Sequence, residues 1–461
     1  MAATEGRIQR QAKAKRFGEI VTDSSKVKRS SVFVALKGER FDGHRFVKDA
    51  VSRGAACVVV HQSVRRSDCQ DAAVIKVPDT LRALGDLAHY RREKYAPRVL
   101  AITGSNGKTT TKEMLSAILQ QASLDGTRLH GKVLKTAGNF NNLVGLPLTL
   151  LRLNKKHRVA VVEMGTNRPG EIKRLAEVAA PDLGIITSVA AAHLEGLKSL
   201  AGVAKEKGAL FQGMRRTGTI AVNLDDPWVA RLADNFHGRK ITYGRRGNVR
   251  AESDVTFDVE GMRFTLRVGA QRCRVRLHFI GEHNIVNAVG AAAMAHGLGV
   301  GLTAIRRGLE SVKPYQMRMQ VESWRGIGII NDAYNANPAS MNAAVSTLAN
   351  MGTSGERIAV LGDMFELGKQ SQRRHLQFGA HLASARIDRV YLLGEHATDV
   401  QKGALRGGMK ADRVIIGKNY AEVAGRLRSH MKKGDWLLFK GSRGMKMETI
   451  VRRLKGQERG E

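Results

Sequence analysis

Short apolar segments alternate with longer amphipathic ones through most of the chain, which is typical of α/β proteins. In the first part of the chain, short apolar segments predict strands, and residues 80–95, whose apolar positions recur at helical spacing, predict a helix. Pro97 then marks a domain boundary. The strands predicted before that helix are residues 32–36, 57–60 and 74–77.

The middle of the chain begins with an apolar strand, residues 99–103, which runs into a glycine-rich turn and a helical pattern over residues 109–121. This order is expected at the start of a nucleotide-binding α/β domain. Further strands are predicted at residues 159–163 and 183–188. Residues 249–277 alternate apolar and polar positions, which predicts antiparallel strands added to that domain.

A second break falls near Lys313 and Pro314, and beyond it apolar strands again alternate with helical segments. The alternation predicts another open parallel sheet. Its predicted strands are residues 327–331, 358–361, 389–393, 413–416 and 436–439.

The two breaks divide the 461 residues into three predicted α/β domains, at residues 1–96, 97–313 and 314–461. We expect a small N-terminal α/β domain, a central P-loop-type ATPase domain with a mainly parallel sheet, and a C-terminal domain with a Rossmann-like open α/β sheet.

The three cysteines, Cys57, Cys69 and Cys273, are far apart and form no CxxC pair, which argues against a disulfide framework or a zinc site. The basic N-terminus lacks the apolar core of a signal peptide, and no apolar run approaches the roughly 18 residues needed to span a bilayer. We therefore expect a cytoplasmic protein without a membrane span.

The chain carries 76 Lys and Arg against 42 Asp and Glu, and the resulting net charge of +34 raises nucleic acid or an anionic membrane as a partner. The excess is spread over all three predicted domains, with no basic tail and little aromatic interleaving for stacking on bases. A solvated basic surface or attraction for polyanionic small substrates is favoured, and no nucleic acid partner is expected. A basic P-loop NTPase that acts on nucleic acid is the rival from another class.

A phosphate loop is predicted between the first strand and helix of the central domain. Gly104 and Gly107 let backbone N–H groups turn toward phosphate oxygens, and the helix adds the positive end of its dipole. Lys108 would reach the β- and γ-phosphates of ATP, and Thr109 would hold Mg²⁺. The predicted ATP-binding residues of the loop are Thr103, Gly104, Ser105, Asn106, Gly107, Lys108, Thr109 and Thr110.

With Ile102 in place of the first glycine, this loop departs from the strict P-loop pattern and resembles the TGxNGKT form of the Mur ligase family. Further segments resemble that family in order over residues 20–455, and they imply a monomeric ATP-dependent amide-bond ligase. They are residues 32–60, TAGNFNN at 136–142, EMGTNRPGEIKRLAEVAAPDLGIITSVAAAHLEGL at 163–197, GEHNIVNAVGAAAMA at 281–295, NDAYNANPASMNAAV at 331–345, LGDMFELG at 361–368 and KGSRGMKME at 440–448.

Two segments distinguish members of the family that have different substrates. YNANP at 334–338 and LGDMFELG at 361–368 are similar to members that join D-alanyl-D-alanine to UDP-N-acetylmuramoyl-tripeptide, whereas members that add the third residue usually carry a histidine-containing segment at the first place. The implied reaction makes an acyl phosphate from ATP and the peptide carboxylate, which the incoming amine then attacks. A sister enzyme that adds the third residue or glutamylates folate is a rival hypothesis, and so is a non-catalytic binding module.

Bringing a triphosphate and a carboxylate together needs preorganised cations, and the resemblance implies two magnesium ions. Glu163 ends a predicted strand, and with Thr109 it is the candidate for the first ion. The resemblance implies that His193 and a carbamylated lysine hold the second, and the spacing of the lysines to the following apolar residues favours Lys207 over Lys205. The predicted catalytic residues are Lys108, Glu163, His193 and Lys207.

Other polar residues match family positions around the substrates. Those implied around ATP are Asn287, Arg318, Asp332 and Tyr334, the last as a cover for adenine. Those expected at the sugar, the peptide or the phosphoryl group are Thr136, Asn139, Asn141, Asn142, Asn335, Asn337, Lys440, Ser442 and Arg443. A structural, turn-forming role is the alternative for the asparagines among them.

The candidates for the uridine diphosphate lie in the first domain. They are Ser24, Lys37, Asp42 and His44. Here the chain has Asp23-Ser24-Ser25 where the family usually has Asp-Ser-Arg, so a cation expected by the resemblance is missing from this segment.

Overall fold

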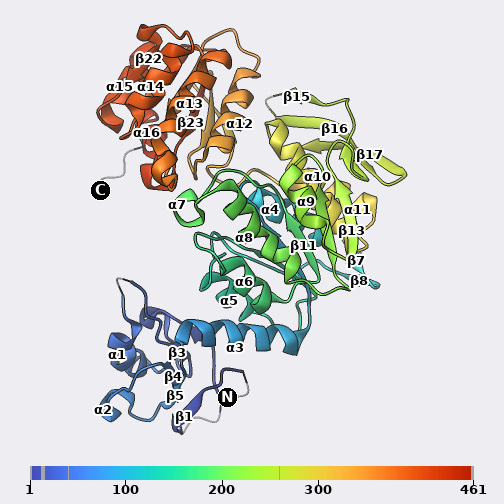
Figure 1. Cartoon of the computed structure of the whole chain (residues 1–461), viewed down its shortest axis with the longest axis vertical. Coiled ribbons are helices and arrows are strands. Elements are labelled where there is room, and N and C mark those ends of the chain that lie inside the picture. The colour runs from blue at the N-terminus through green and yellow to red at the C-terminus, as the bar shows by residue number, and fades with distance from the viewer. Residues whose placement is uncertain (1–2, 12–15, 40, 259, 458–461) are drawn as a thin grey trace.

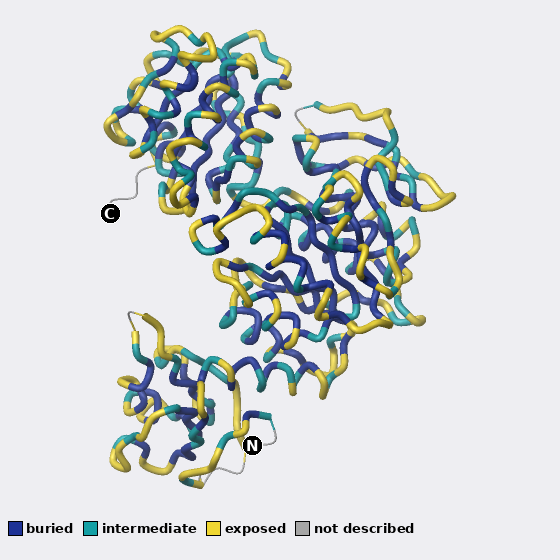
Figure 2. The backbone as a smooth tube through the Cα atoms, in the orientation of Figure 1, coloured by how far each residue is buried: buried dark blue, intermediate teal, exposed yellow. Residues whose placement is uncertain are grey.

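The computed structural model describes residues 3–11, 16–39, 41–258 and 260–457, which are organised around three large sheets (Figure 1). The N-terminal and C-terminal sheets lie at opposite ends of the molecule, and the central sheet lies between them. The buried backbone follows the strands of all three (Figure 2). Among the described residues, no helix is both long and apolar enough to cross a membrane.

The N-terminal unit contains β1 (Arg7–Arg10), β2 (Ile20–Val21), η1 (Ser24–Lys26), β3 (Val32–Val34), η2 (Gly43–Phe46), α1 (Val47–Ser52), β4 (Cys57–Val60), α2 (Arg66–Cys69) and β5 (Ala73–Lys76). Its strand order is β1-β5-β4-β3-β2, with only β1 antiparallel to its neighbour. Apolar residues of the short central strands fill the core beneath α1, and Phe33 and Val58 are fully buried there.

Helix α3 (Thr80–Tyr95) joins this unit to the central one. Asp79 caps its N-terminus by accepting two backbone N–H groups. Near its other end, Arg92 donates to the carbonyl oxygens of Ala179 and Ala180 and pairs with Asp182 at 3.2 Å. The helix is therefore anchored in the central unit by a buried guanidinium.

The central unit contains β6 (Arg98–Thr103), α4 (Lys108–Gln120), β7 (Ser123–Leu124), β8 (Thr127–Arg128), β9 (Val133–Lys135), α5 (Gly145–Leu150), β10 (Val159–Glu163), α6 (Glu171–Ala179), β11 (Leu183–Ile186), α7 (Leu194–Leu197), α8 (Leu200–Gln212), β12 (Thr219–Asn223), α9 (Pro227–Ala233), β13 (Arg239–Tyr243), β14 (Val249–Ala251), β15 (Thr256–Asp258), β16 (Gly261–Val268), β17 (Gln271–Leu277), α10 (Glu282–Gly297) and α11 (Leu302–Ser311). The sheet order is β15-β16-β14-β13-β12-β11-β6-β10-β9, with β17 paired to β16. Strands β9 to β14 run parallel, and β14 to β17 form the predicted antiparallel addition.

The C-terminal unit contains β18 (Gln320–Trp324), β19 (Ile327–Asp332), α12 (Pro338–Ala349), β20 (Arg357–Leu361), η3 (Gly368–Gln370), α13 (Ser371–Ser384), β21 (Arg389–Leu392), α14 (Ala397–Arg406), η4 (Ala411–Arg413), β22 (Val414–Ile416), α15 (Tyr420–His430), β23 (Trp436–Lys440), η5 (Arg443–Met445) and α16 (Glu448–Leu454). The order β18-β19-β23-β20-β21-β22 is parallel apart from the edge strand β18, which the sequence did not predict.

The predicted fold class is confirmed: a small N-terminal α/β domain, a central domain with a mainly parallel sheet, and a C-terminal open α/β sheet. Strand β6 begins at Arg98, and α11 ends at Ser311, nine residues before Gln320, where β18 begins. The predicted domain boundaries at 96/97 and 313/314 stay predictions.

Candidate active site

Four neighbouring parallel strands, β11, β6, β10 and β9, end at the same edge of the central sheet. Glu163 is the last residue of β10, Thr136 follows β9, the phosphate loop follows β6, and the segment after β11 leads to His193. Because the carboxyl ends of parallel strands form the usual ligand crevice of an open α/β sheet, this edge is the candidate active site.

Both predicted glycines of the phosphate loop are required by their surroundings. Gly104 has φ +146°, and a Cβ there would lie 1.9 Å from the hydroxyl of Thr187. Gly107 has φ +80°, and its Cβ would lie 2.1 Å from Oδ1 of Asn287 in α10. The loop is thus held between β11 and α10, which places the predicted ATP residue Asn287 against it.

Lys108 folds back over the loop, where its Nζ donates to the carbonyl oxygens of Gly104 at 2.7 Å and Ser105 at 3.3 Å. Burial lowers its pKa from the ordinary lysine value, although Glu163 opposes that shift. The hydroxyls of Thr103 and Ser105 are hydrogen-bonded within the protein, since they donate to the carbonyl oxygens of Met164 and Ala190, respectively.

Glu163 is the centre of the buried part of the site, with only 2% of its surface exposed. The hydroxyl of Thr109 lies 3.0 and 3.2 Å from its two carboxylate oxygens, and Nδ2 of Asn141 donates to Oε1 at 2.9 Å. Its backbone N–H donates to the hydroxyl of Thr136 at 3.0 Å. Two residues predicted separately for metal and substrate, Thr109 and Asn141, therefore converge on the carboxylate of Glu163, and Thr136 holds its backbone.

Lys112, which the sequence reasoning missed, lies beside this carboxylate and is 1% exposed. Its Nζ lies 3.7 Å from Glu163 and 3.1 Å from Glu113, and it donates to the carbonyl oxygen of Thr136 at 2.9 Å. Its position in the sequence is a usable signal, because it follows Lys108 by four residues on α4 and shares that face of the helix.

His193 and Lys207 occupy different settings. His193 precedes α7, and its Nδ1 lies 2.5 Å from Oε2 of Glu366 in the C-terminal unit, a hydrogen bond that lowers the pKa of that carboxyl. Lys207 is 1% exposed on α8, and burial followed by the charge of Lys108 lowers its pKa well below the ordinary value. Lys205 on the same helix is exposed.

In the C-terminal unit, Lys440 is buried at the end of β23 and pairs with Asp332 at 2.5 Å. Its Nζ also donates to the carbonyl oxygen of Asn335 at 2.9 Å, and its expected contact with the substrate stays a prediction. The guanidinium of Arg318 lies 3.9 Å from the ring centre of Tyr334, so that face of the ring is covered by protein.

Several substrate candidates have structural partners. Asn142 accepts the backbone N–H of Gly145 at the start of α5, whereas Asn139 is exposed. Ser442 accepts the backbone N–H of Phe365 at 2.7 Å, and Arg443 pairs with Glu448 at 2.8 Å.

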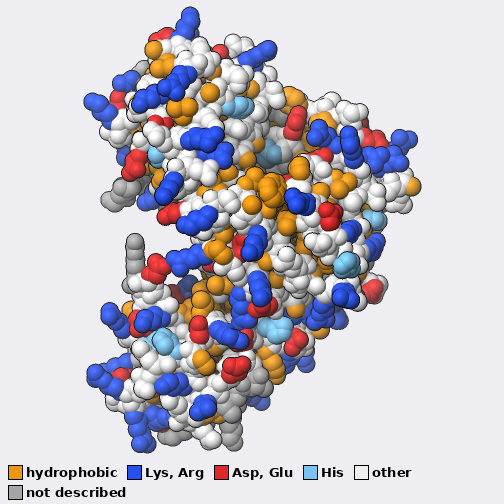
Figure 3. All heavy atoms as spheres, viewed as in Figure 1, with side chains coloured by type: hydrophobic (Ala, Val, Ile, Leu, Met, Phe, Trp, Pro, Cys, Tyr) orange, Lys and Arg blue, Asp and Glu red, His pale blue; other side chains and the backbone are white. Residues whose placement is uncertain are grey.

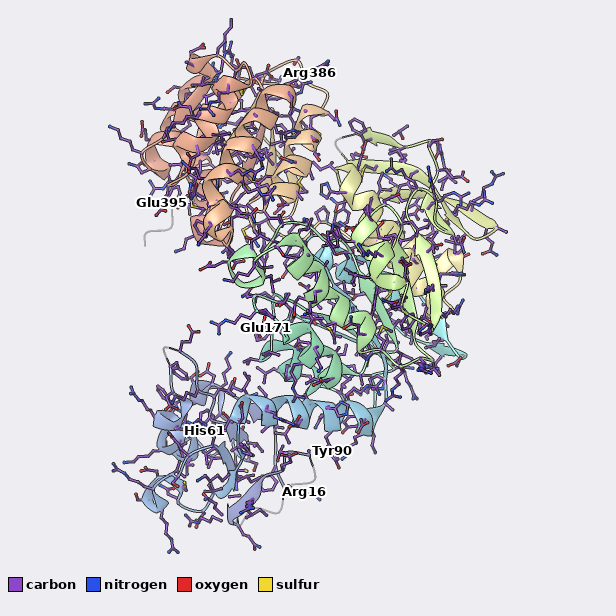
Figure 4. The ribbon with its side chains drawn as sticks, viewed as in Figure 1. Arg16, His61, Tyr90, Glu171, Arg386 and Glu395 are labelled. Carbon is purple, nitrogen blue, oxygen red and sulfur yellow. The ribbon has the colours of Figure 1, made fainter. Side chains whose placement is uncertain are left out.

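The predicted uridine residues lie in the N-terminal unit, apart from the phosphate loop. Asp42 accepts the backbone N–H and the Nδ1 of His44, and the backbone contact is the main cause of its lowered pKa. The imidazole of His44 also accepts the backbone N–H of His61, marked in Figure 4, while Lys37 is exposed and Ser24 half-buried.

On the left side of Figure 3, a hollow lies between this unit and the part of the chain above it, with basic side chains along its margin. Glu39 and Arg168 form an exposed ion pair between the N-terminal and central units at 2.5 Å. Figure 4 marks Glu171 at the start of α6, on the side of the central unit that faces the hollow.

Family models match most of the chain in three consecutive segments. The Mur ligase family, catalytic domain, matches residues 16–92; the Mur ligase middle domain matches residues 102–295; and the Mur ligase, glutamate ligase domain, matches residues 317–443.

Among curated relatives, proteins named UDP-N-acetylmuramoyl-tripeptide--D-alanyl-D-alanine ligase from Bacillus subtilis and Escherichia coli are each 38% identical to this chain. The alignments cover 94% of this chain and 92% of the B. subtilis protein, and 96% and 94% for E. coli. Among solved structures, MurF from Acinetobacter baumannii has a TM-score of 0.90 at 33% identity, covering 99% of this chain and 97% of that one.

Proposed function

Because this chain belongs to the Mur ligase family, we propose that it joins D-alanyl-D-alanine to UDP-N-acetylmuramoyl-tripeptide in peptidoglycan precursor synthesis. ATP drives the reaction and leaves as ADP and phosphate. The structural observation that carries the proposal is the convergence of Thr109 and Glu163, 3.0 Å apart, directly behind the phosphate loop. The dipeptide specificity is supported by the names of relatives that align along more than nine-tenths of the chain.

The chain's own residues supply binding and charge stabilisation for phosphoryl transfer. The backbone N–H groups at the start of α4 would receive the phosphates, whereas those of Ser105 and Asn106 already donate to Ser188. Lys108 would exchange its two carbonyl contacts for phosphate oxygens. Asn287, Asp332 and Tyr334 would then hold the nucleoside. The peptide carboxylate attacks the γ-phosphorus, and the amine of D-alanyl-D-alanine attacks the resulting acyl phosphate and displaces phosphate.

Magnesium fits the donor set at the strand ends, because hydroxyl and carboxylate oxygens are its preferred ligands. Thr109 and Glu163 would hold one ion, and His193 with Lys207 as its carbamate would hold another. When bound, the ions neutralise charge on the phosphoryl and carboxylate oxygens. A buried lysine of lowered pKa supports the carbamate, since only the neutral amine reacts with carbon dioxide.

The sugar and peptide of the substrate would lie between the central and C-terminal units. The residues proposed there are Thr136, Asn139, Asn141, Asn142, Asn335, Asn337, Lys440, Ser442 and Arg443. Ser24, Lys37, Asp42 and His44 would receive the uridine diphosphate across the hollow. We take the enzyme as a monomer in the cytoplasm, where ATP and nucleotide-linked precursors are available.

The test measures phosphate release by the purified protein with ATP, Mg²⁺ and UDP-N-acetylmuramoyl-tripeptide, with and without D-alanyl-D-alanine, together with the mass of the product. Release that requires both substrates, with a product heavier by the dipeptide, supports the proposal. Turnover with a single amino acid instead would identify a sister ligase, and stimulation by nucleic acid alone would favour the rival NTPase, whose affinity would fall steeply with salt.

A further inference from the structure

A loop of the C-terminal unit, residues 363–368, docks on the segment of the central unit that contains His193. The carboxylate of Glu366 contacts Nδ1 of His193 at 2.5 Å, and its backbone carbonyl accepts the N–H of Glu195 at 3.0 Å. Gly368 lies against the same place, since a Cβ there would be 3.5 Å from Cα of Glu195. Side-chain and backbone contacts thus fix the two segments together.

Both residues of the side-chain contact have left-handed backbones, with φ 55° at His193 and φ 63° at Glu366. For residues with a Cβ this conformation is strained, and it persists only where surrounding contacts impose it. The two strained residues, His193 and Glu366, are the ones that bring the imidazole and the carboxylate together. Backbone strain at this contact indicates a functional constraint on it.

The contact determines which imidazole nitrogen carries the proton. An ionised carboxylate can only accept a hydrogen bond, so Nδ1 of His193 must be the donor, and the lone pair is then on Nε2. Histidines that bind metals commonly donate their second ring N–H to a carboxylate, which fixes the ring and raises its basicity.

We infer that Glu366 is a positioning residue that prepares Nε2 of His193 for the second metal ion, and that this preparation is complete only when the C-terminal unit is docked. The inference rests on the proposed function, in which His193 is a metal ligand. Docking of the C-terminal unit makes His193 a stronger metal ligand. By the reciprocity of linked equilibria, binding of the metal ion must therefore favour docking of the C-terminal unit. Metal binding and closure of these two domains are therefore coupled through one hydrogen bond.

The experiment compares Glu366→Ala and Glu366→Gln with a matched control, Glu195→Gln, in the full-length protein. Glu195 is an exposed carboxylate two residues from His193 whose described contact with Glu366 uses only its backbone. Mn²⁺ binding is titrated with ADP present and followed by electron paramagnetic resonance. The tautomer of His193 is assigned by ¹⁵N-histidine NMR, using His193→Gln to identify its signals.

We expect Glu366→Ala to weaken one class of Mn²⁺ sites about 10-fold and to mix the two tautomers of His193. Glu366→Gln, whose amide oxygen can still accept the Nδ1–H, should recover part of both properties, and Glu195→Gln should match the wild type. The inference is overturned if Glu366→Ala binds Mn²⁺ like the wild type, or if His193 carries its proton on Nε2 in the wild type. Product formation by the wild type separates either result from failure of the proposed function.

Discussion

Asn106 in the phosphate loop and Asn337 at the start of α12 exchange two side-chain hydrogen bonds across the junction of the central and C-terminal units. Nδ2 of Asn337 donates to Oδ1 of Asn106 at 2.8 Å, and Nδ2 of Asn106 donates back at 3.3 Å. Oδ1 of Asn337 also accepts the backbone N–H of Ser340 at 2.9 Å. One amide therefore caps a C-terminal helix and fixes it against the phosphate loop.

Replacing Asn337 separates these two roles. Asn337→Ala should lose about 1 kcal/mol of unfolding free energy with the helix cap, whereas Asn337→Asp keeps an acceptor for Ser340 and should stay within about 0.5 kcal/mol of the wild type. Both variants lack the donor to Asn106, so both should raise the KM for ATP. Urea denaturation and phosphate-release kinetics measure the two effects. An unchanged KM in both variants would show that the amide pair does not position the loop.

Lys112 and Lys135 offer a matched pair, because both contact Glu113 but only Lys112 is buried. Lys112→Met leaves the carboxylate of Glu163 buried beside Glu113 without its cation. We expect a loss of about 3 kcal/mol in the free energy of unfolding, against less than about 1 kcal/mol for Lys135→Met. Equal losses in urea titrations would contradict the compensating role of Lys112.

The pKa of Glu356 makes the folding stability of the C-terminal unit depend on pH. Burial works to raise its pKa, but hydrogen bonds from His430 and Arg413 and the charge of Arg389 outweigh it and bring the pKa to about 2. A carboxyl whose pKa is lower in the folded state stabilises the fold above its unfolded value, 4.5, and loses that contribution as the pH falls toward 2.

Replacing Glu356 by Gln should therefore lower the unfolding free energy at pH 7 by about 2 kcal/mol, after discounting for partial exposure. The difference in unfolding free energy between the variant and the wild type should shrink as the pH falls from 4.5 to 2. Unfolding of both proteins followed by circular dichroism at several pH values measures this. A difference that stays constant over that range would mean that the ion cluster does not contribute through ionisation.

The sequence predicted best those elements whose local pattern is unambiguous. The strand at residues 57–60 and the helix at 80–95 were placed at their observed bounds, because buried apolar runs and helical periodicity are local signals. Strand β18 (Gln320–Trp324) was missed, since it is a half-exposed edge strand with polar residues whose pairing with β19 depends on a distant partner.

The same limit applies to the site. The phosphate loop and Glu163 follow from strand ends and glycine spacing, which can be read locally. The partner of His193 is 173 positions away, and no spacing rule connects it to Glu366. Lys440 shows the same limit, because its pairing with Asp332, 108 positions away, could not be read from the sequence, and its expected contact with the substrate stays a prediction.

Lys205 and Lys207 test the carbamate directly, since they share α8 and differ in burial. Lys207 is 1% exposed and burial lowers its pKa, which favours the neutral amine that reacts with carbon dioxide, whereas Lys205 faces solvent. With ¹³C-labelled bicarbonate, a carbamate carbon signal should appear in the wild type and in Lys205→Ala and be absent from Lys207→Ala.

Ligase activity should also depend on Lys207 and not on Lys205. Lys207→Ala should lower kcat by about 100-fold or more, the scale of losing a charged group that acts in the transition state, and Lys205→Ala should stay within about 2-fold. Carbon dioxide-free buffer should reduce the activity of the wild type, and bicarbonate should restore it without affecting Lys207→Ala. A wild type that is indifferent to bicarbonate and shows no carbamate signal would leave Lys207 acting as a buried amine, and the second ion would need another anionic ligand.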